Sequence, residues 1–216
     1  FMITAPINIQ NNHYLNFLSP LLNVLFIPFV TFILFPMSFL VILFPFLDRG
    51  YYIICICFES LSLLLSKIDI LLFSFKYMNL ILFILYYVII IFLLNKMRYY
   101  DYKFIFIFVI VLMLHIIYPY IEQKSYVTFL DVGQGDSTLI KTSKVSILID
   151  TGGIYSTPLA NNVIVPTLRS YGLNKLDYLV LSHGDYDHMG EAMNLVNNFK
   201  VKKVIFNCGE FNDLEK

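Results

Sequence analysis

The sequence predicts a multi-pass α-helical membrane segment followed by a layered α/β domain. The 216 residues are 58% hydrophobic, above the roughly 45–50% that is usual in soluble domains. Charge is also uneven, because residues 1–121 hold 10 of the 30 charged side chains and residues 122–216 hold the other 20. We therefore assign 1–121 to a membrane region and 122–216 to a globular domain, and we expect the chain to be a piece of a longer protein.

Three apolar runs predict membrane-spanning helices, which need about 20 mostly apolar residues. Residues 79–95 and 104–120 carry no charge and have aromatic residues near their ends, as interfacial anchors do. Residues 21–47 are equally free of charge but contain three prolines. Prolines of this kind predict a kinked or broken span among neighbouring helices.

The stretch 51–76 is apolar but is interrupted by charged residues. It predicts an interfacial or re-entrant helix. The alternatives are a further span with a buried Glu59, which would be a functional candidate, or a Glu59 at the membrane boundary. The basic loop 96–103 predicts a cytoplasmic loop, which delivers the globular domain to the outer side of the membrane.

Two histidines and two cysteines of the apolar half and one cysteine of the globular half are not expected to bind metal or to form disulfides. His13 and His115 stand alone in sequence, and we expect both to be packed or interfacial residues. Cys55, Cys57 and Cys208 are expected to be small hydrophobic fillers.

The globular half changes to short alternating or apolar runs from Tyr126 onward. Two hairpin strands followed by alternating helices and strands predict a sheet covered by helices. A helix before Gly172 has the usual glycine stop. The expected strands cover 126–130, 137–143, 145–150, 176–182 and 202–207, and the expected helices cover 161–172 and 189–199.

The segment "LSHGDYDHMG" lies between strand 176–182 and helix 189–199. Ligands of open α/β sheets gather at the carboxyl ends of strands, so this loop is the candidate active site. His183, Asp185, Asp187 and His188 offer the nitrogen and oxygen donors that suit zinc, manganese or iron. Two ions about 3.5–4 Å apart would clamp the attacking and leaving oxygens of a phosphoester. The plain alternative is a solvated loop in which Asp187 caps the following helix.

Three motifs in order, "FLDVGQGDSTLI", "LIDTGG" and "LDYLVLSHGDYDHMG", resemble the metallo-β-lactamase-like domain of the ComEC family. ComEC proteins are bacterial competence channels that move single-stranded DNA across the cytoplasmic membrane. The preceding span with its prolines resembles the end of that family's competence membrane domain. The resemblance covers about residues 19–209.

The resemblance implies an αβ/βα metallo-β-lactamase-like fold that is incomplete at the C-terminus. It implies one metal site with His183 and Asp185, and a second with Asp187 and His188, the two residues we expect to be catalytic. Asp150 would order the metal loop from behind the ligands.

The same resemblance bears on the turn motif and on the metal. Asp131, Gln134 and Asp136 would either fix a hairpin or contact substrate. Asp185 replaces the histidine that is usual in the superfamily, which favours manganese over zinc, with one or two ions bound. No histidine follows His188, so we expect this piece to have an incomplete metal centre and little hydrolytic activity.

The resemblance implies that the protein is a component of a DNA-uptake channel in the bacterial cytoplasmic membrane, with a domain that hydrolyses phosphodiesters. Its partners would be single-stranded DNA, other competence-machinery proteins and the lipid bilayer. The alternatives are a non-catalytic docking or gating module, or a membrane-tethered metallo-hydrolase of a small molecule. Local residues add little for DNA, because the only basic clusters are modest: Lys141 with Lys144, and Lys200 with Lys202 and Lys203.

Overall fold

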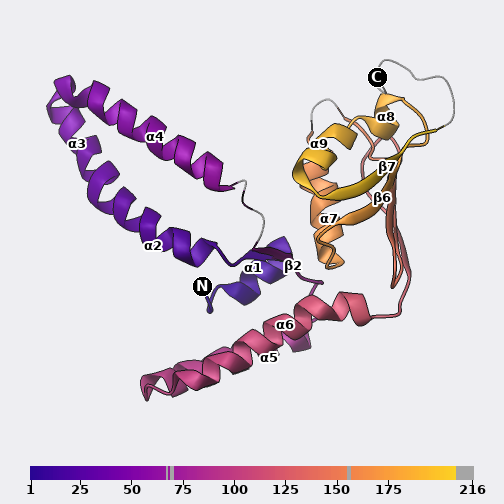
Figure 1. Ribbon diagram of the computed structural model, residues 1–216, viewed down its shortest axis with the longest axis horizontal. Helices are drawn as coiled ribbons and strands as arrows, with labels where there is room; N and C mark the ends of the chain where they lie inside the picture. The colour runs from indigo at the N-terminus through magenta and orange to yellow at the C-terminus, as the bar shows by residue number, and fades with distance from the viewer. Residues whose placement is uncertain (67, 69–70, 155–156, 208–216) are drawn as a thin grey trace. The chain divides into compact units, whose positions relative to one another are not determined.

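The computed structural model describes residues 1–66, 68, 71–154 and 157–207, and it divides into two compact units (Figure 1). One unit contains residues 16–72 together with Phe1, and the other contains residues 2–15 and the chain from Phe73 onward. Lys67 and Asp69 of the predicted interfacial segment lie outside the described residues, as do Cys208 and the rest of 208–216.

The first unit is a pair of long apolar helical segments. α2 (Ser19–Phe29), a π-helical turn (Val30–Leu34) and α3 (Phe35–Leu43) follow one another without a break. The wider turn precedes Pro36, whose missing N–H cannot complete the regular α-helical ladder. The helix ends at Leu43 and not at 47 as predicted, because Phe44 precedes Pro45 and leaves the helical conformation, with φ −129° and ψ 79°.

The second segment of this unit is α4 (Asp48–Ser66), which follows a short 3-10 turn (Pro45–Leu47). Phe58 of α4 packs on Phe26 and Phe29 of α2, with ring centroids 5.2 Å apart in both pairs. Within the described residues, the predicted segment 51–76 is helical up to Ser66. After it the chain forms strand β2 (Leu72–Ser74), which pairs with β1 (Tyr14–Asn16) near the N-terminus.

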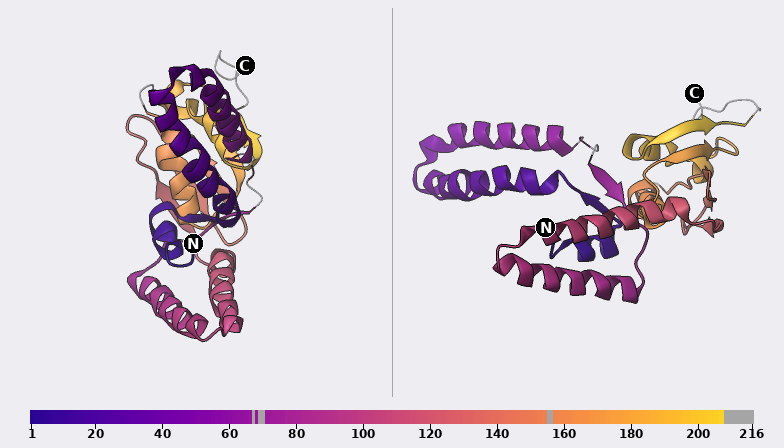
Figure 2. Two further views of the ribbon diagram at one scale, coloured as in Figure 1. Left: turned by 90° about the vertical axis from the view of Figure 1, so that its left-hand side faces the viewer. Right: turned by 60° about the horizontal axis from the view of Figure 1, so that its bottom comes forward.

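The second unit begins with α1 (Ala5–Asn12) and contains the hairpin of α5 (Leu80–Arg98) and α6 (Ile105–Ile121), joined through a 3-10 turn at Tyr102–Phe104 (Figure 2). Asn79 caps α5 by accepting the amide of Leu82 at 2.9 Å. Among the described residues, three helices are long and apolar enough to cross a membrane: Ser19–Leu43, Leu80–Arg98 and Tyr102–Ile121. These helices overlap the three predicted spans.

A five-stranded sheet forms the body of the globular domain. Its strands lie in the order β3 (Tyr126–Phe129), β4 (Thr138–Lys141), β5 (Ser146–Ile149), β6 (Leu176–Val180) and β7 (Val201–Ile205). The first three strands are antiparallel, and β5, β6 and β7 are parallel. The predicted α/β layered class is thus confirmed.

One face of this sheet carries the hydrophobic core. Leu139, Leu148 and Leu179 have no exposed surface and belong to one buried cluster with residues of the helical segments. These segments are a π-helical turn (Ala160–Ile164), α7 (Val165–Ser170), α8 (Tyr186–Met189) and α9 (Ala192–Asn198). The other face carries an apolar row, Phe129, Thr138, Ile149, Val180 and Ile205, in register across all five strands. Phe129 is 81% exposed among the described residues.

Two helices of the domain differ from the predicted ranges. The helix expected at 189–199 is two helices, α8 and α9, with a break at Gly190, where a side chain would meet the carbonyl oxygen of Tyr186 at 2.5 Å. Asp187 lies inside α8, whose N-cap is Asp185, and the N-cap of α9 is Glu191. Asp187 is therefore not the N-cap that the alternative interpretation expected. The other helix, expected at 161–172, ends at Ser170, and the predicted glycine stop follows at Gly172, with φ +74°.

A polar cluster lies where β2 leads into α5 and where α6 leads into β3. Lys76 and Glu122 form a buried ion pair, and Tyr126 Oη lies 3.1 Å from Lys76 Nζ and 2.8 Å from Glu122 Oε1. Burial lowers the pKa of Lys76, but hydrogen bonds to Glu122 and Tyr126 outweigh it and raise the pKa. Burial raises the pKa of Glu122, but bonds from Lys76 and Tyr126 lower it overall.

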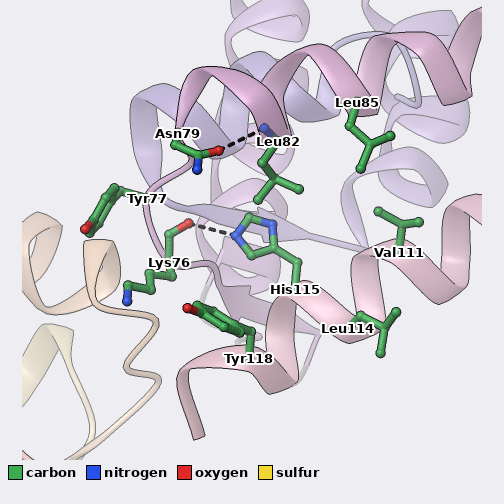
Figure 3. A pocket seen from close by; sticks show the side chains of 9 residues that line it. All are labelled: Lys76, Tyr77, Asn79, Leu82, Leu85, Val111, Leu114, His115 and Tyr118. Carbon is green, nitrogen blue, oxygen red and sulfur yellow. Dashed lines mark hydrogen bonds between the residues drawn. The ribbon is translucent and has the colours of Figure 1, made fainter. Parts of the chain in front are cut away.

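His115 is a packed residue, as its sequence context predicted. Its Nε2 lies 2.9 Å from the carbonyl oxygen of Lys76, and its Nδ1 lies 3.0 Å from Tyr86 Oη. It lines a cavity of about 430 Å³ between α5 and α6, to which Lys76 and Tyr118 also contribute (Figure 3). Both ring nitrogens have protein partners, so His115 is not a spare metal ligand.

Candidate metal centre

The predicted site residues gather at one edge of the sheet. β4 is antiparallel to both β3 and β5, and β6 is parallel to β5, so β3, β5 and β6 end at the same edge. The turn 131–136 follows β3, Asp150 follows β5, and the loop 183–188 follows β6. Three segments far apart in sequence therefore meet at the carboxyl ends of the strands.

Asp150 is the most constrained of these residues. It is 3% exposed and has a positive φ of 59°. Its Oδ1 accepts the amide of Ser182 at 2.8 Å, and its Oδ2 accepts the hydroxyl of Ser182 at 2.6 Å and lies 3.0 Å from His188 Nδ1. Asp150 thus holds the start of the loop and one histidine ring at the same time.

The four candidate ligands form two pairs. His183 Nε2 lies 3.3 Å from Asp185 Oδ2, and His188 Nε2 lies 3.8 Å from Asp187 Oδ2. The two imidazole rings lie next to each other, with centroids 3.9 Å apart and planes tilted by 47°. Within the part of the chain that the structure describes, no three histidine, cysteine, aspartate or glutamate side chains are arranged to hold one ion together.

The electrostatics of the loop act on His188. Burial lowers the pKa of His188, but the hydrogen bond to Asp150 and the negative charges of Asp150, Asp187 and Asp136 outweigh it and raise the pKa. A proton on Nδ1 donated to Asp150 leaves Nε2 as the nitrogen with a free lone pair. The surrounding carboxylates make this corner attractive to a cation.

The turn 131–136 packs directly on the metal loop. Gly135 has φ +118°, and a Cβ there would lie 2.0 Å from the carbonyl oxygen of Asp187. The carbonyl oxygen of Asp136 accepts the amide of Gly152 at 3.0 Å. Asp131 Oδ1 accepts the amide of Gly133 at 3.4 Å, and Gln134 is exposed. These contacts support the hairpin-fixing interpretation of the motif.

Gly135→Ala is expected to destabilise the domain, because alanine is strained at this φ and its methyl group would push the backbone of Asp187 away. The conformational cost alone is about 1–3 kcal/mol, or roughly 2–12 °C in Tm for a chain of this size. Thermal melts in detergent micelles measure it. Gly50→Ala is the control, because no atom lies within 4 Å of that position in α4, and alanine there favours the helix. Equal melting of both variants would refute the close approach.

Sequence reasoning missed two supporting residues, Ser182 and Thr151. The hydroxyl of Ser182 lies between Asp150 and His183, 2.8 Å from His183 Nδ1. The amide and hydroxyl of Thr151 both donate to the carbonyl oxygen of His188, at 2.6 and 3.1 Å. Each lies two residues beyond the end of a strand and next to a residue singled out from the sequence, Asp150 or His183, which was the available signal.

Comparison with known proteins agrees with this architecture. Residues 130–207 match the family model of the metallo-beta-lactamase superfamily. The chain is 36% identical over 110 residues to ComE operon protein 3 of Bacillus subtilis, covering 44% of this chain and 14% of that protein. It is 45% identical over 69 residues to competence protein ComA of Neisseria gonorrhoeae, covering 32% and 10%.

A third relative is recombination protein 2 of Haemophilus influenzae, 40% identical over 74 residues, which covers 34% of this chain and 9% of that protein. The chain therefore spans about a tenth of the length of the relatives it matches. The ComEC-like resemblance and the metallo-β-lactamase-like domain expected from the sequence are both confirmed.

Proposed function

We propose that this ComEC-like chain is part of a DNA-uptake channel in the bacterial cytoplasmic membrane, and that its metallo-β-lactamase-like domain hydrolyses phosphodiesters with bound divalent metal. The competence relatives and three apolar helices support the membrane role. The observation that carries the hydrolase role is the placement of two His–Asp pairs, backed by Asp150, at the carboxyl edge of the sheet.

The donor chemistry of the site fits a divalent metal. His183 with Asp185 would hold one ion, and His188 with Asp187 a second, each completed by water, substrate or residues other than those described. The oxygen of Asp185 makes manganese a better candidate than zinc. Bound ions of this kind supply positive charge that stabilises a phosphate undergoing displacement.

The chain's own residues would prepare this site before any substrate binds. Asp150 accepts the Nδ1 proton of His188, which fixes the tautomer and aims Nε2 at the cation. The turn with Asp131, Gln134 and Asp136 would hold the loop from the other side. Single-stranded DNA and other competence proteins are the partners we propose, with the domain on the outer side of the membrane.

A second candidate function is a non-catalytic docking or gating module of the channel. It is favoured by the arrangement of the described candidate ligands, which form two pairs. A catalytic zinc centre normally has three protein ligands. This module would keep the loop as a rigid surface without turnover.

Calorimetric titration with Mn²⁺ and Zn²⁺, combined with cleavage of a single-stranded oligonucleotide, tests both functions in a form of the protein extended at its C-terminus, because this piece alone is expected to have little hydrolytic activity. We expect the double variant His183→Ala/Asp187→Ala to lose metal affinity by more than the roughly 10–100-fold that loss of an outer ligand partner costs, and to lose cleavage. Asp101→Asn, in the loop between α5 and α6, is the control for a changed carboxylate. Metal binding without cleavage would favour the docking module, and cleavage unaffected by the double variant would refute the assigned ligands.

A further inference from the structure

A small cavity lined by lysines lies at the opposite edge of the sheet from the metal centre. It has a volume of about 220 Å³ and is formed at the carboxyl end of β4, the amino ends of β5, β6 and β7, and the end of α6. The sequence shows two modest lysine clusters, and the fold brings members of both together here. The lysines that line the cavity are Lys141, Lys144, Lys175 and Lys202.

The cavity has an excess of positive charge. Four lysines line it with one carboxylate, Asp177, so the formal balance is 4 − 1 = +3. Asp177 is already engaged, because it pairs with Lys202 and accepts the amide and hydroxyl of Ser146 at 2.9 and 3.1 Å. The nearby carboxylate Glu122 is engaged in the same way by Lys76.

Lys141 is the buried member of the set. It is 2% exposed, and its amine donates to the carbonyl oxygen of Pro119 at 3.2 Å. Burial and the charge of Lys76 lower its pKa, and the attraction of Glu122 opposes them without restoring the ordinary value. A further anion next to this amine would therefore stabilise its charged form. Lys144 and Lys175 are exposed at the mouth.

The position of the cavity indicates what kind of anion it meets. Pro119 and Tyr120 line it, and they are among the last residues of α6, a helix long and apolar enough to cross the bilayer. A tyrosine at the end of such a helix is typical of the membrane interface. The cavity therefore lies at the level of lipid headgroups if α6 spans the membrane.

We propose that this cavity binds the phosphate of an anionic phospholipid headgroup and so holds the globular domain against the bilayer surface. Basic pockets beside membrane helices bind anionic headgroups through this combination of charge and position. A cavity of about 220 Å³ that is open at one side suits one headgroup. A nucleic acid strand would need an open groove that follows several phosphates, with aromatic side chains for stacking. The inference depends on the membrane location in the proposed function and not on the metal chemistry.

Lipid titration of the full chain in detergent micelles, read by native mass spectrometry, tests the proposal. We expect phosphatidylglycerol to bind more tightly than zwitterionic phosphatidylcholine. In Lys144→Gln/Lys175→Gln this preference should fall, by about fivefold per lysine and about 30-fold for the pair. Both side chains are exposed, so folding should be retained, and a thermal melt checks it. The matched control is Lys200→Gln/Lys203→Gln, which changes the charge equally on exposed lysines outside the cavity.

Several outcomes would overturn the proposal. An unchanged preference in the cavity variant, or an equal fall in the control, would show that the cavity is not the site. Displacement of the lipid by inorganic phosphate at the same concentration would identify a soluble phosphate as the occupant, and displacement by a single-stranded oligonucleotide would identify nucleic acid. Flotation with vesicles distinguishes failure of the proposed membrane location from failure of the lipid site. A chain that does not insert would contradict the membrane location itself. An inserted chain without lipid preference would contradict only the lipid site.

Discussion

Asp150→Asn is expected to weaken divalent metal binding by about 10–100-fold, the range found when a partner behind a ligating histidine is lost. The geometry gives the reason. The backbone amide of Ser182 donates to Oδ1 and needs an acceptor there, so the amide nitrogen of asparagine would occupy the position of Oδ2. That nitrogen would then donate to His188 Nδ1, where the wild-type carboxylate accepts. The ring proton would move to Nε2, which blocks the nitrogen that faces Asp187.

The measurement is calorimetric titration with Mn²⁺, together with the ¹⁵N chemical shifts of His188, which report the tautomer directly. A purely structural role of Asp150 would change stability without reversing the tautomer. Asp177→Asn is the matched control, because Asp177 also accepts a backbone amide, that of Ser146, but lies at the other end of the sheet. Retained Mn²⁺ affinity in Asp150→Asn, or equal loss in the control, would contradict the positioning role.

The strands and the position of the loop 183–188 after β6 could be predicted from the sequence because their signals are local. Apolar runs of strand length alternate with glycine turns, and the strongest cluster of ligand residues directly follows a strand. The role of Asp150, which ends one apolar run, was implied by the ComEC resemblance and not by a local signal. Its contacts with Ser182 and His188 join residues more than 30 positions apart, and no local pattern encodes them.

The features that were missed depend on long-range contacts. The break between α8 and α9 follows from the close approach of Gly190 to the backbone of Gly153 and to Tyr186. β1 and β2 pair across more than 50 residues, so the end of the predicted interfacial segment could not be recognised as a strand. The lysine cavity needs the same kind of information, because each of its lysines alone looks like an ordinary surface residue.

Breaking the ion pair between Lys76 and Glu122 is expected to have the largest effect on stability. Their side chains are 7% and 6% exposed. Removing one partner of a buried pair costs about 3–5 kcal/mol, because the other charge is left without compensation. For a chain of this size that corresponds to a fall in Tm of roughly 6–20 °C. Glu122→Gln is the preferred change, since it removes the charge while the glutamine oxygen can still accept from Tyr126 and Tyr118.

The pH dependence identifies the charge as the cause. The pKa of Glu122 is lowered in the folded state, so the wild type gains stability from this group above the unfolded pKa of about 4.3. That gain is lost as the pH falls through the lower folded pKa. The difference in Tm between wild type and Glu122→Gln should therefore be full at pH 7 and should shrink when melts are repeated below about pH 4.

A second variant separates the charge from the space it occupies. Lys76→Met/Glu122→Gln removes both charges and keeps side chains of similar length, so it should melt well above Glu122→Gln alone, since replacing a whole buried pair is often nearly neutral. Lys103→Met is the control, because Lys103 pairs with Asp101 at 3.5 Å while 75% of its side chain is exposed, and such surface pairs contribute about 0–1 kcal/mol. If the single and double variants have the same Tm, the unpaired charge of Lys76 is not the cause of the destabilisation, and the prediction is wrong.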